Sequence, residues 1–187
     1  MLIPALGGAE RRVAEFDIQP VLIFAPSWLP DGTWLVVSAR MGTAATNTLY
    51  RCSIDSGEMV RLTEPPPEAA HGDDSPAVAP DGRAIAFVRA GIFTFTHLYV
   101  LPISQEGKPA GPLKRIDTGA YSVQLAWTAD NRGLIFSTVG VRANLVRIPA
   151  DGSGNPVPLG LPEATQPAIS GRGNRLVYAE RRGDTNI

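Results

Sequence analysis

The sequence repeats one phrase four times, and this repetition limits the possible folds more than any other feature. The copies begin at Pro26, Pro76, Leu125 and Pro167 and read PSWLPDGTWLVVS, PAVAPDGRAIAFV, LAWTADNRGLIFS and PAISGRGNRLVYA. A second phrase lies between them and reads LYRCSIDSGEMVRLT from Leu49, LYVLPISQEGKPAGPLKRI from Leu98 and LVRIPADGSGNPVPL from Leu145. Self-similarity at such a period indicates an array of supersecondary units.

The first phrase predicts a β-hairpin. Its turn residues are Pro30, Asp31 and Gly32, then Pro80, Asp81 and Gly82, then Asp130 with Asn131 in the glycine position. Proline fixes φ, the carboxylate can accept backbone N–H bonds, and glycine can adopt positive φ. The fourth copy has Gly-Arg-Gly at 171–173, which keeps only the flexibility. The apolar runs WLVV, AIAF, GLIF and RLVY that follow predict strands covered on both faces.

The second phrase predicts another hairpin, with turns at 55–57, 105–107 and 151–154. One apolar residue precedes each turn, namely Cys52, Leu101 or Ile148. Cys52 is therefore expected to be a buried, unreactive thiol. The first residues of the chain, MLIPALGGAERRVA, fit this phrase without its opening position. They align Ile3 with Cys52, Leu101 and Ile148, so Ile3 is expected to be buried as well.

Four short strands per 42 to 50 residues, counted between matched turns, predict the blades of a β-propeller. We expect one all-β domain over 1–187, with repeat units of about 1–49, 50–98, 99–145 and 146–187. It would hold three complete four-stranded antiparallel blades and two half-blades. The alternative is an antiparallel sandwich with a similar number of strands.

Both ends of the chain fall inside a repeat, since Met1 has the phase of Tyr50 and Ile187 has the phase of Leu49. The ends can share one blade and close a four-bladed ring, which would leave no sheet edge. The alternative is an open arc taken from a larger propeller. Domain borders usually lie in exposed linkers, so the breaks inside strands favour the open arc.

The repeat resembles the WD40-like PD40 repeat of TolB-like propellers, P-x-W-S-P-D-G-x-x-I-A-F. The matching residues are Pro26, Trp28, Pro30, Asp31, Gly32, Pro76, Pro80, Asp81, Gly82, Ile85, Ala86, Phe87, Trp127 and Asp130. The serine of the pattern is kept only at Ser170 and is replaced by Leu29, Ala79 and Thr128. The resemblance implies a propeller and a periplasmic or otherwise extracytoplasmic protein, although this chain begins without a signal-peptide pattern.

Composition argues against several functions. A net charge of −1 does not suit a nucleic-acid partner, and no apolar run is long enough to insert into a membrane. The chain has one cysteine and two histidines, His71 and His97, too few for a structural zinc site. It has no G-x-S-x-G motif. We therefore expect no catalytic residue, no metal and no cofactor.

Binding is the remaining expectation. In a propeller the two hairpin turns of each blade share one face, and the other loops share the opposite face. Those other loops vary in length here, at 40–47, 64–74, 90–96, 117–124 and 160–166, and variable loops on a rigid scaffold usually carry recognition. The candidate contact residues are Arg40, His71, Asp73, Asp74, Phe93, Phe95 and Tyr121. Alternatively, Phe93 and Phe95 extend a strand, and the two aspartates only keep a loop soluble.

The sequence thus predicts a noncatalytic module that binds a protein or small ligand, as the sensory or interaction part of a longer bacterial protein. The resemblance implies one alternative, the substrate-gating propeller of a prolyl-oligopeptidase-type serine peptidase whose catalytic domain lies elsewhere. The rest of the same propeller would be a further partner if the chain is a fragment.

Overall fold

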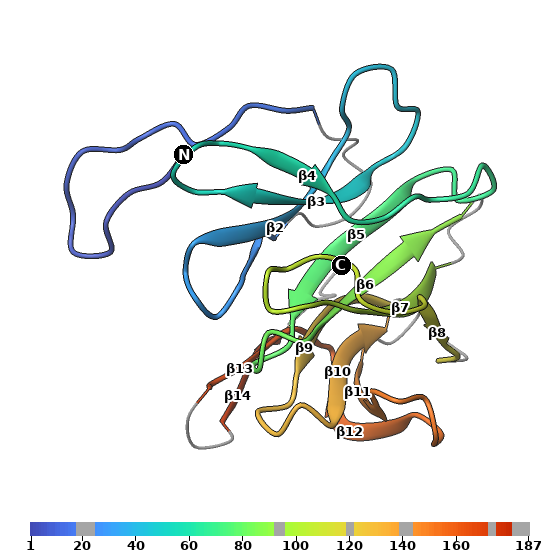
Figure 1. Ribbon diagram of the computed structural model, residues 1–187. Helices are drawn as coiled ribbons and strands as arrows, with labels where there is room; N and C mark the ends of the chain where they lie inside the picture. The colour runs from blue at the N-terminus through green and yellow to red at the C-terminus, as the bar shows by residue number, and fades with distance from the viewer. Residues whose placement is uncertain (18–24, 92–95, 119–121, 139–143, 172–174, 181–187) are drawn as a thin grey trace, which may run out of the picture.

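A computed structural model describes residues 1–17, 25–91, 96–118, 122–138, 144–171 and 175–180. In these residues all regular secondary structure is β-strand, arranged as three four-stranded antiparallel sheets and one two-stranded sheet (Figure 1). The strands are β1 (Ser27–Trp28), β2 (Trp34–Ala39), β3 (Thr48–Ser53), β4 (Met59–Arg61), β5 (Gly72–Val78), β6 (Ala84–Ala90), β7 (Thr96–Pro102), β8 (Lys114–Ile116), β9 (Ser122–Trp127), β10 (Gly133–Thr138), β11 (Asn144–Pro149), β12 (Val157–Pro162), β13 (Ala164–Ile169) and β14 (Leu176–Glu180). The part of the chain described contains no helix that could cross a membrane.

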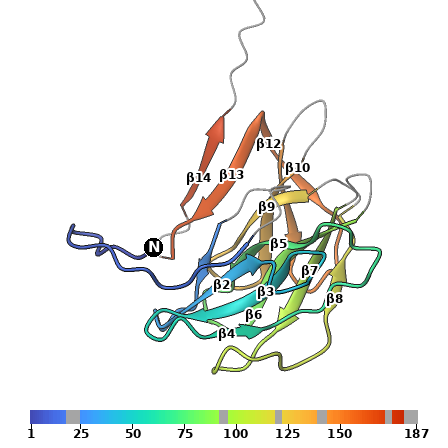
Figure 2. The same ribbon diagram turned by 90° about the horizontal axis from the view of Figure 1, so that it is seen from above.

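Each sheet follows chain order, so consecutive strands are neighbours. We name β1–β4 blade 1, β5–β8 blade 2, β9–β12 blade 3 and β13–β14 half-blade 4. The first strands of the blades touch in succession, β1 with β5, β5 with β9 and β9 with β13. Sheets that meet along their first strands form the arc of a propeller, which confirms the predicted fold over the sandwich (Figures 1 and 2).

The turns of the first hairpins form as the sequence predicts. In each, the aspartate Oδ1 accepts the backbone N–H two residues later: Asp31 from Thr33 at 3.0 Å, Asp81 from Arg83 at 2.9 Å and Asp130 from Arg132 at 3.0 Å. The next position has positive φ, with 71° at Gly32, 70° at Gly82 and 60° at Asn131. Neighbouring turns also touch, because the N–H of Asp81 donates to Asn131 Oδ1 at 3.0 Å.

The hydrophobic core lies between the blades. One cluster joins blades 1 and 2 and includes Val36, Leu49, Ile85 and Phe87, each fully buried. A second cluster joins blades 2 and 3. Alternate residues of a strand point to its two faces, one toward the preceding blade and one toward the following blade. Both faces are therefore buried, which explains why the runs in β2, β6 and β10 are apolar without interruption. Cys52 is 2% exposed, as expected, and burial raises the pKa of its thiol.

The first strands are also joined by polar contacts. The indole Nε1–H of Trp127 on β9 donates to the carbonyl of Ala77 on β5 at 2.9 Å. The N–H of Val78 on β5 donates to Ser27 Oγ on β1 at 2.9 Å. Each blade is therefore fixed to the next at the inner end of the arc.

The turns of the second hairpins make a contact that recurs along the arc. A Cβ placed on Gly107 would lie 2.8 Å from Leu29 Cδ2, and one on Gly152 would lie 3.1 Å from Ile116 Cδ1. Gly57 approaches the carbonyl of Val13 in the same way. Each of these turns thus packs against the preceding repeat, and the glycines permit the close approach.

Two burial expectations at the chain ends are wrong. Ile3 is 58% exposed, although Cys52, Leu101 and Ile148 at the matching position are almost fully buried. In the RLVY run, Val177 is 68% and Tyr178 is 38% exposed. Among the described residues β14 pairs only with β13. No further strand or blade therefore covers Val177 and Tyr178 in the described part of the chain. The arc is open in this structure.

Candidate functional site

The first strands of the blades and the residues just before them border a small open hollow of about 220 Å³ on the inner side of the arc. It is lined by Ala25, Ser75, Pro76, Gln124, Leu125, Gln166 and Pro167. Aligning the four repeats places these residues at the same two positions of each copy. We call this hollow the axial pocket.

Irregular backbone presents these residues to the axial pocket. The register of β5 shifts between Asp74 and Ala77, and that of β13 shifts between Thr165 and Ala168. Within these bulges Ser75 has φ 52° and Gln166 has φ 55°. Residues other than glycine rarely adopt positive φ, and such strain concentrates at binding sites. A bulge also re-aims the side chain that it carries.

Gln124 organises the polar side of the axial pocket. Its Oε1 accepts the backbone N–H of Gln166 at 3.0 Å and the hydroxyl of Ser137 at 3.4 Å. Because its carbonyl oxygen is used in this way, Gln124 has its NH₂ group to offer a ligand as a donor. The pocket therefore suits a neutral group that carries a hydrogen-bond acceptor.

A buried ion pair supports the inner strand of blade 2. Arg89 Nε donates to Asp73 Oδ1 at 2.5 Å and Nη2 donates to Oδ2 at 2.8 Å, with Asp73 0% and Arg89 9% exposed. Burial raises the pKa of Asp73, while Arg89 counteracts this effect. Burial lowers the pKa of Arg89, but its interactions with Asp73, Tyr99 and Glu68 together leave the pKa raised. The carbonyl of Asp73 also accepts the hydroxyl of Ser38 on β2 at 2.7 Å.

Asp74 is the second buried carboxylate at this junction. Its Oδ2 accepts the Asn47 Nδ2–H at 3.1 Å, and both residues are fully buried. Among the described groups, Oδ1 of Asp74 has no hydrogen-bond partner. Burial raises the pKa of Asp74 to about 6. Asn47 thus ties the loop between β2 and β3 to blade 2, and its carbonyl accepts the N–H of Asp73 at 2.9 Å.

The structure corrects part of the predicted binding face. Asp73 and Asp74 were expected in an exposed loop at 64–74, but β5 begins at Gly72 and both side chains are withdrawn from solvent. They hold blades 1 and 2 together and offer a partner no exposed surface. The predicted loops 117–124 and 160–166 are likewise shortened, because β9 begins at Ser122 and β13 begins at Ala164.

The other predicted contact residues divide into two groups. Arg40 and His71 are partly buried. The Arg40 N–H donates to the Asp17 carbonyl at 2.7 Å, and the His71 N–H donates to the Ala90 carbonyl at 3.1 Å. Phe93, Phe95 and Tyr121 lie outside the described residues. Within the described part of the chain, no group of three His, Cys, Asp or Glu side chains converges on a possible metal position.

The pocket residues Ser75, Gln124 and Gln166 were not singled out from the sequence. Their signal was present, because each directly precedes the opening residue of a repeat, Pro76, Leu125 or Pro167. Asp73 had no such signal. Continued from the turn at 80–82 without interruption, the hairpin register puts Asp74 opposite Arg89, and only the register shift between Asp74 and Ala77 brings Asp73 there.

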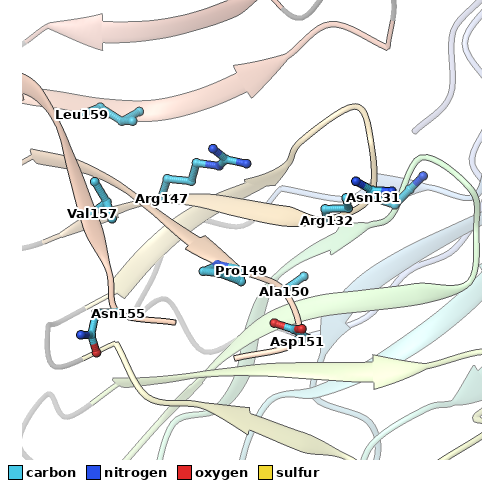
Figure 3. A pocket seen from close by; sticks show the side chains of 9 residues that line it. All are labelled: Asn131, Arg132, Arg147, Pro149, Ala150, Asp151, Asn155, Val157 and Leu159. Carbon is cyan, nitrogen blue, oxygen red and sulfur yellow. The ribbon is translucent and has the colours of Figure 1, made fainter. Parts of the chain in front are cut away.

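A larger cavity, of about 760 Å³, lies on the side of blade 3 that no further complete blade covers in the described residues. Arg147 extends across its middle, with Val157 and Leu159 on one side and Asn131 and Arg132 on the other (Figure 3). The remaining lining residues are Pro149, Ala150, Asp151 and Asn155. We call it the Arg147 cavity.

Comparison with known proteins identifies the fold. No protein-family model matches the chain, and no curated protein matches it. Among solved structures, TolB from Acinetobacter baumannii is similar, with a TM-score of 0.66 and 21% identity over 87% of this chain. A structure of a nidogen/laminin complex has a TM-score of 0.61 at 11% identity over 86% of this chain. Oligogalacturonate lyase from Vibrio parahaemolyticus has a TM-score of 0.59, also at 11% identity over 86%.

The match covers 39% of the TolB chain, 58% of the chain in the nidogen/laminin complex and 46% of the lyase. This chain therefore spans about two fifths to three fifths of the length of these structures. At such identities the likeness concerns the fold. The chain has a TolB-like β-propeller fold, of which it forms an open arc.

Proposed function

We propose that the chain is a noncatalytic propeller module that binds a segment of a partner protein or a small ligand in the axial pocket. The observation that supports this proposal is the convergence of one repeat position from four repeats on a single cavity, with positive φ at Ser75 and Gln166. Bulges re-aim the side chains that they carry, and strained backbone of this kind concentrates at functional sites, which favours recognition at this position.

The size and chemistry of the axial pocket limit the ligand. A volume of about 220 Å³ is below the range of sites for drug-sized molecules. It suits one inserted side chain or a comparably small group. The Gln124 NH₂ group would donate to a carbonyl or hydroxyl of that group, while prolines and Leu125 contact its apolar part. The role of a peptidase-gating propeller stays a prediction from the resemblance.

A selection experiment tests the proposal. Peptides selected from a displayed library on the whole protein should lose at least tenfold in affinity for Gln166→Trp, because the indole would fill the pocket. Gln166 is exposed, so the variant should keep its fold. Glu58→Trp is the control, since Glu58 is also exposed and lies next to a hairpin turn, away from the axial pocket. Peptides that bind Gln166→Trp and the wild type equally would remove the axial pocket as the site.

A further inference from the structure

The face of blade 1 opposite to blade 2 carries an apolar pocket of about 230 Å³. Leu35 and Val37 on β2 and Cys52 on β3 contribute one part of its lining. Ala14 and Phe16 of the N-terminal segment contribute another part. We call it the Cys52 pocket.

This pocket lies where the other blades have a larger side chain. Val37 has the repeat position of Phe87 in blade 2 and of Phe136 in blade 3, as the registers of the strands show. Both phenylalanines are 0% exposed and pack against the preceding blade. Blade 1 therefore lacks a phenyl ring at a position where the repeat buries one.

Cys52 enlarges the same space. Its counterparts in blades 2 and 3 are Leu101 and Ile148, which are 5% and 1% exposed. The side chain of cysteine is smaller than either of them. Native cores rarely keep a void that a larger side chain would fill, because the lost contacts cost stability. Two small residues that border one pocket therefore favour a ligand in that space.

The N-terminal segment bounds the pocket on the side away from the sheet. Apolar side chains of residues 13–16 pack against the cluster formed by β2 and β3. At one end of this segment, the Arg40 N–H donates to the carbonyl of Asp17 at 2.7 Å. At the other end, a Cβ placed on Gly57 would lie 2.4 Å from the carbonyl oxygen of Val13. Contacts at both ends therefore hold the segment over this face of blade 1.

The polar side chains at the pocket already have partners within the protein. The hydroxyl of Ser38 donates to the carbonyl of Asp73 at 2.7 Å, and the thiol of Cys52 donates to the carbonyl of Ser53 at 3.7 Å. Burial raises the pKa of this thiol, which keeps it uncharged. The pocket thus offers a ligand apolar contacts and a polarisable sulfur, which packs favourably against aromatic rings.

We propose that the Cys52 pocket binds a small, uncharged aromatic molecule of one ring, in the space that Phe87 and Phe136 fill in their own blades. A cavity of about 150 Å³ is enough to bind benzene, so this pocket has room for a ring with a small substituent. A charged ligand would lose its hydration without gaining a partner. The Cys52 pocket shares only Ala25 with the axial pocket, and the proposal does not depend on the function of the axial pocket.

Titration of the whole chain with toluene, followed in methyl NMR spectra, tests the proposal. Toluene should shift the methyl resonances of Leu35 and Val37 and show nuclear Overhauser contacts with them. Val37→Phe should abolish the shift at Leu35, because its ring would fill the pocket. The variant should keep its circular dichroism spectrum, since phenylalanine is the residue at this position in blades 2 and 3. Val157→Phe, at an exposed residue of blade 3, is the matched control and should bind toluene as the wild type does.

Two further measurements sharpen the test. Cys52→Leu introduces the residue that blade 2 has at this position, and it should weaken toluene binding at least severalfold. Benzoate has the same ring with a charge, and the wild type should bind it at least tenfold more weakly than toluene. If Val37→Phe does not fold, Cys52→Leu and the Overhauser contacts in the wild type decide the question.

Three results would overturn the proposal. A wild type that shows no effect at Leu35 up to the solubility limit of toluene would leave an aromatic side chain of a partner protein as the occupant. Equal binding by the wild type, Val37→Phe and Cys52→Leu would place the toluene site elsewhere. Equal affinity for benzoate and toluene would contradict an apolar site.

Discussion

Asp73 and Arg89 face each other across β5 and β6 and form a two-pronged ion pair, with both side chains withdrawn from water. The guanidinium group also lies 4.9 Å from the ring centroid of Tyr99. The strand that carries Asp73 continues into the bulge at Ser75, which lines the axial pocket. The ion pair therefore fixes the part of blade 2 that presents the proposed site.

Asp73→Asn should destabilise the fold strongly, because it leaves the charge of Arg89 buried without a counter-charge. Loss of one partner of a buried pair typically costs about 3–5 kcal/mol. The free energy of unfolding in urea measures this loss. Asp117→Asn is the control, since its pair with Arg115 is exposed and should change stability by less than about 1 kcal/mol. Equal effects of the two substitutions would contradict a structural role for the Asp73–Arg89 pair.

Asp74 should make the stability depend on pH. Burial raises its pKa from 3.8 to about 6, so the folded chain holds this proton more tightly than the unfolded chain. This tighter binding makes its full contribution to the free energy of unfolding at pH values below the pKa of Asp74 in the unfolded chain. The contribution is lost as the pH rises through the pKa of Asp74 in the folded chain. Between about pH 4.5 and pH 7.5, the wild type should lose roughly 2 kcal/mol that Asp74→Asn does not lose.

The comparison of wild type with Asp74→Asn removes the contribution of titrating groups that do not interact with Asp74. Asp73 does interact with Asp74, and it is paired with Arg89 in both proteins. Urea unfolding at the two pH values gives the required four free energies. Parallel behaviour of the two proteins would show that Asp74 does not hold a proton in the folded state near neutral pH.

Gly72→Ala should prevent blades 1 and 2 from joining correctly. A Cβ on Gly72 would lie 1.9 Å from the Asn47 carbonyl oxygen, and the residue has φ 79°. We expect a loss of about 3 kcal/mol or more, combining the steric clash with the strain of positive φ. Gly160→Ala is the matched control, because it has φ 69° and open space around it. Its loss should be only about 1 kcal/mol. Thermal unfolding of both variants separates steric clash from strain, and equal losses would contradict the close contact with Asn47.

The fold was predictable because the same local signals recur in every repeat. Asp-Gly turns such as Asp81-Gly82 form hairpins by short-range hydrogen bonds. The uninterrupted apolar run at 84–88 predicts a strand that is buried on both faces. Burial at Ile3 and Val177 was predicted wrongly for the same reason. A repeat pattern gives the environment of a complete blade, while these two residues lie in half-blades.

The site was harder to predict, because it depends on contacts between repeats. Asp73 reads as a loop residue when only its polar neighbours are considered, and its partner Arg89 is 16 residues away. Gln124 and Gln166 come together only when the first strands of two repeats meet. Bulges such as that at Ser75 also have no clear local signature, since serine rarely adopts positive φ.

Successive hairpin pairs stack radially, so that the first strand of each blade lies against the first strand of the next. The Trp127 indole N–H donates across this junction to the Ala77 carbonyl. A nuclear Overhauser spectrum of the whole chain tests this arrangement directly. We expect a cross-peak between the Trp127 indole proton and protons of Ala77 or Val78. An assigned indole resonance that instead shows contacts only within its own hairpin would contradict the propeller.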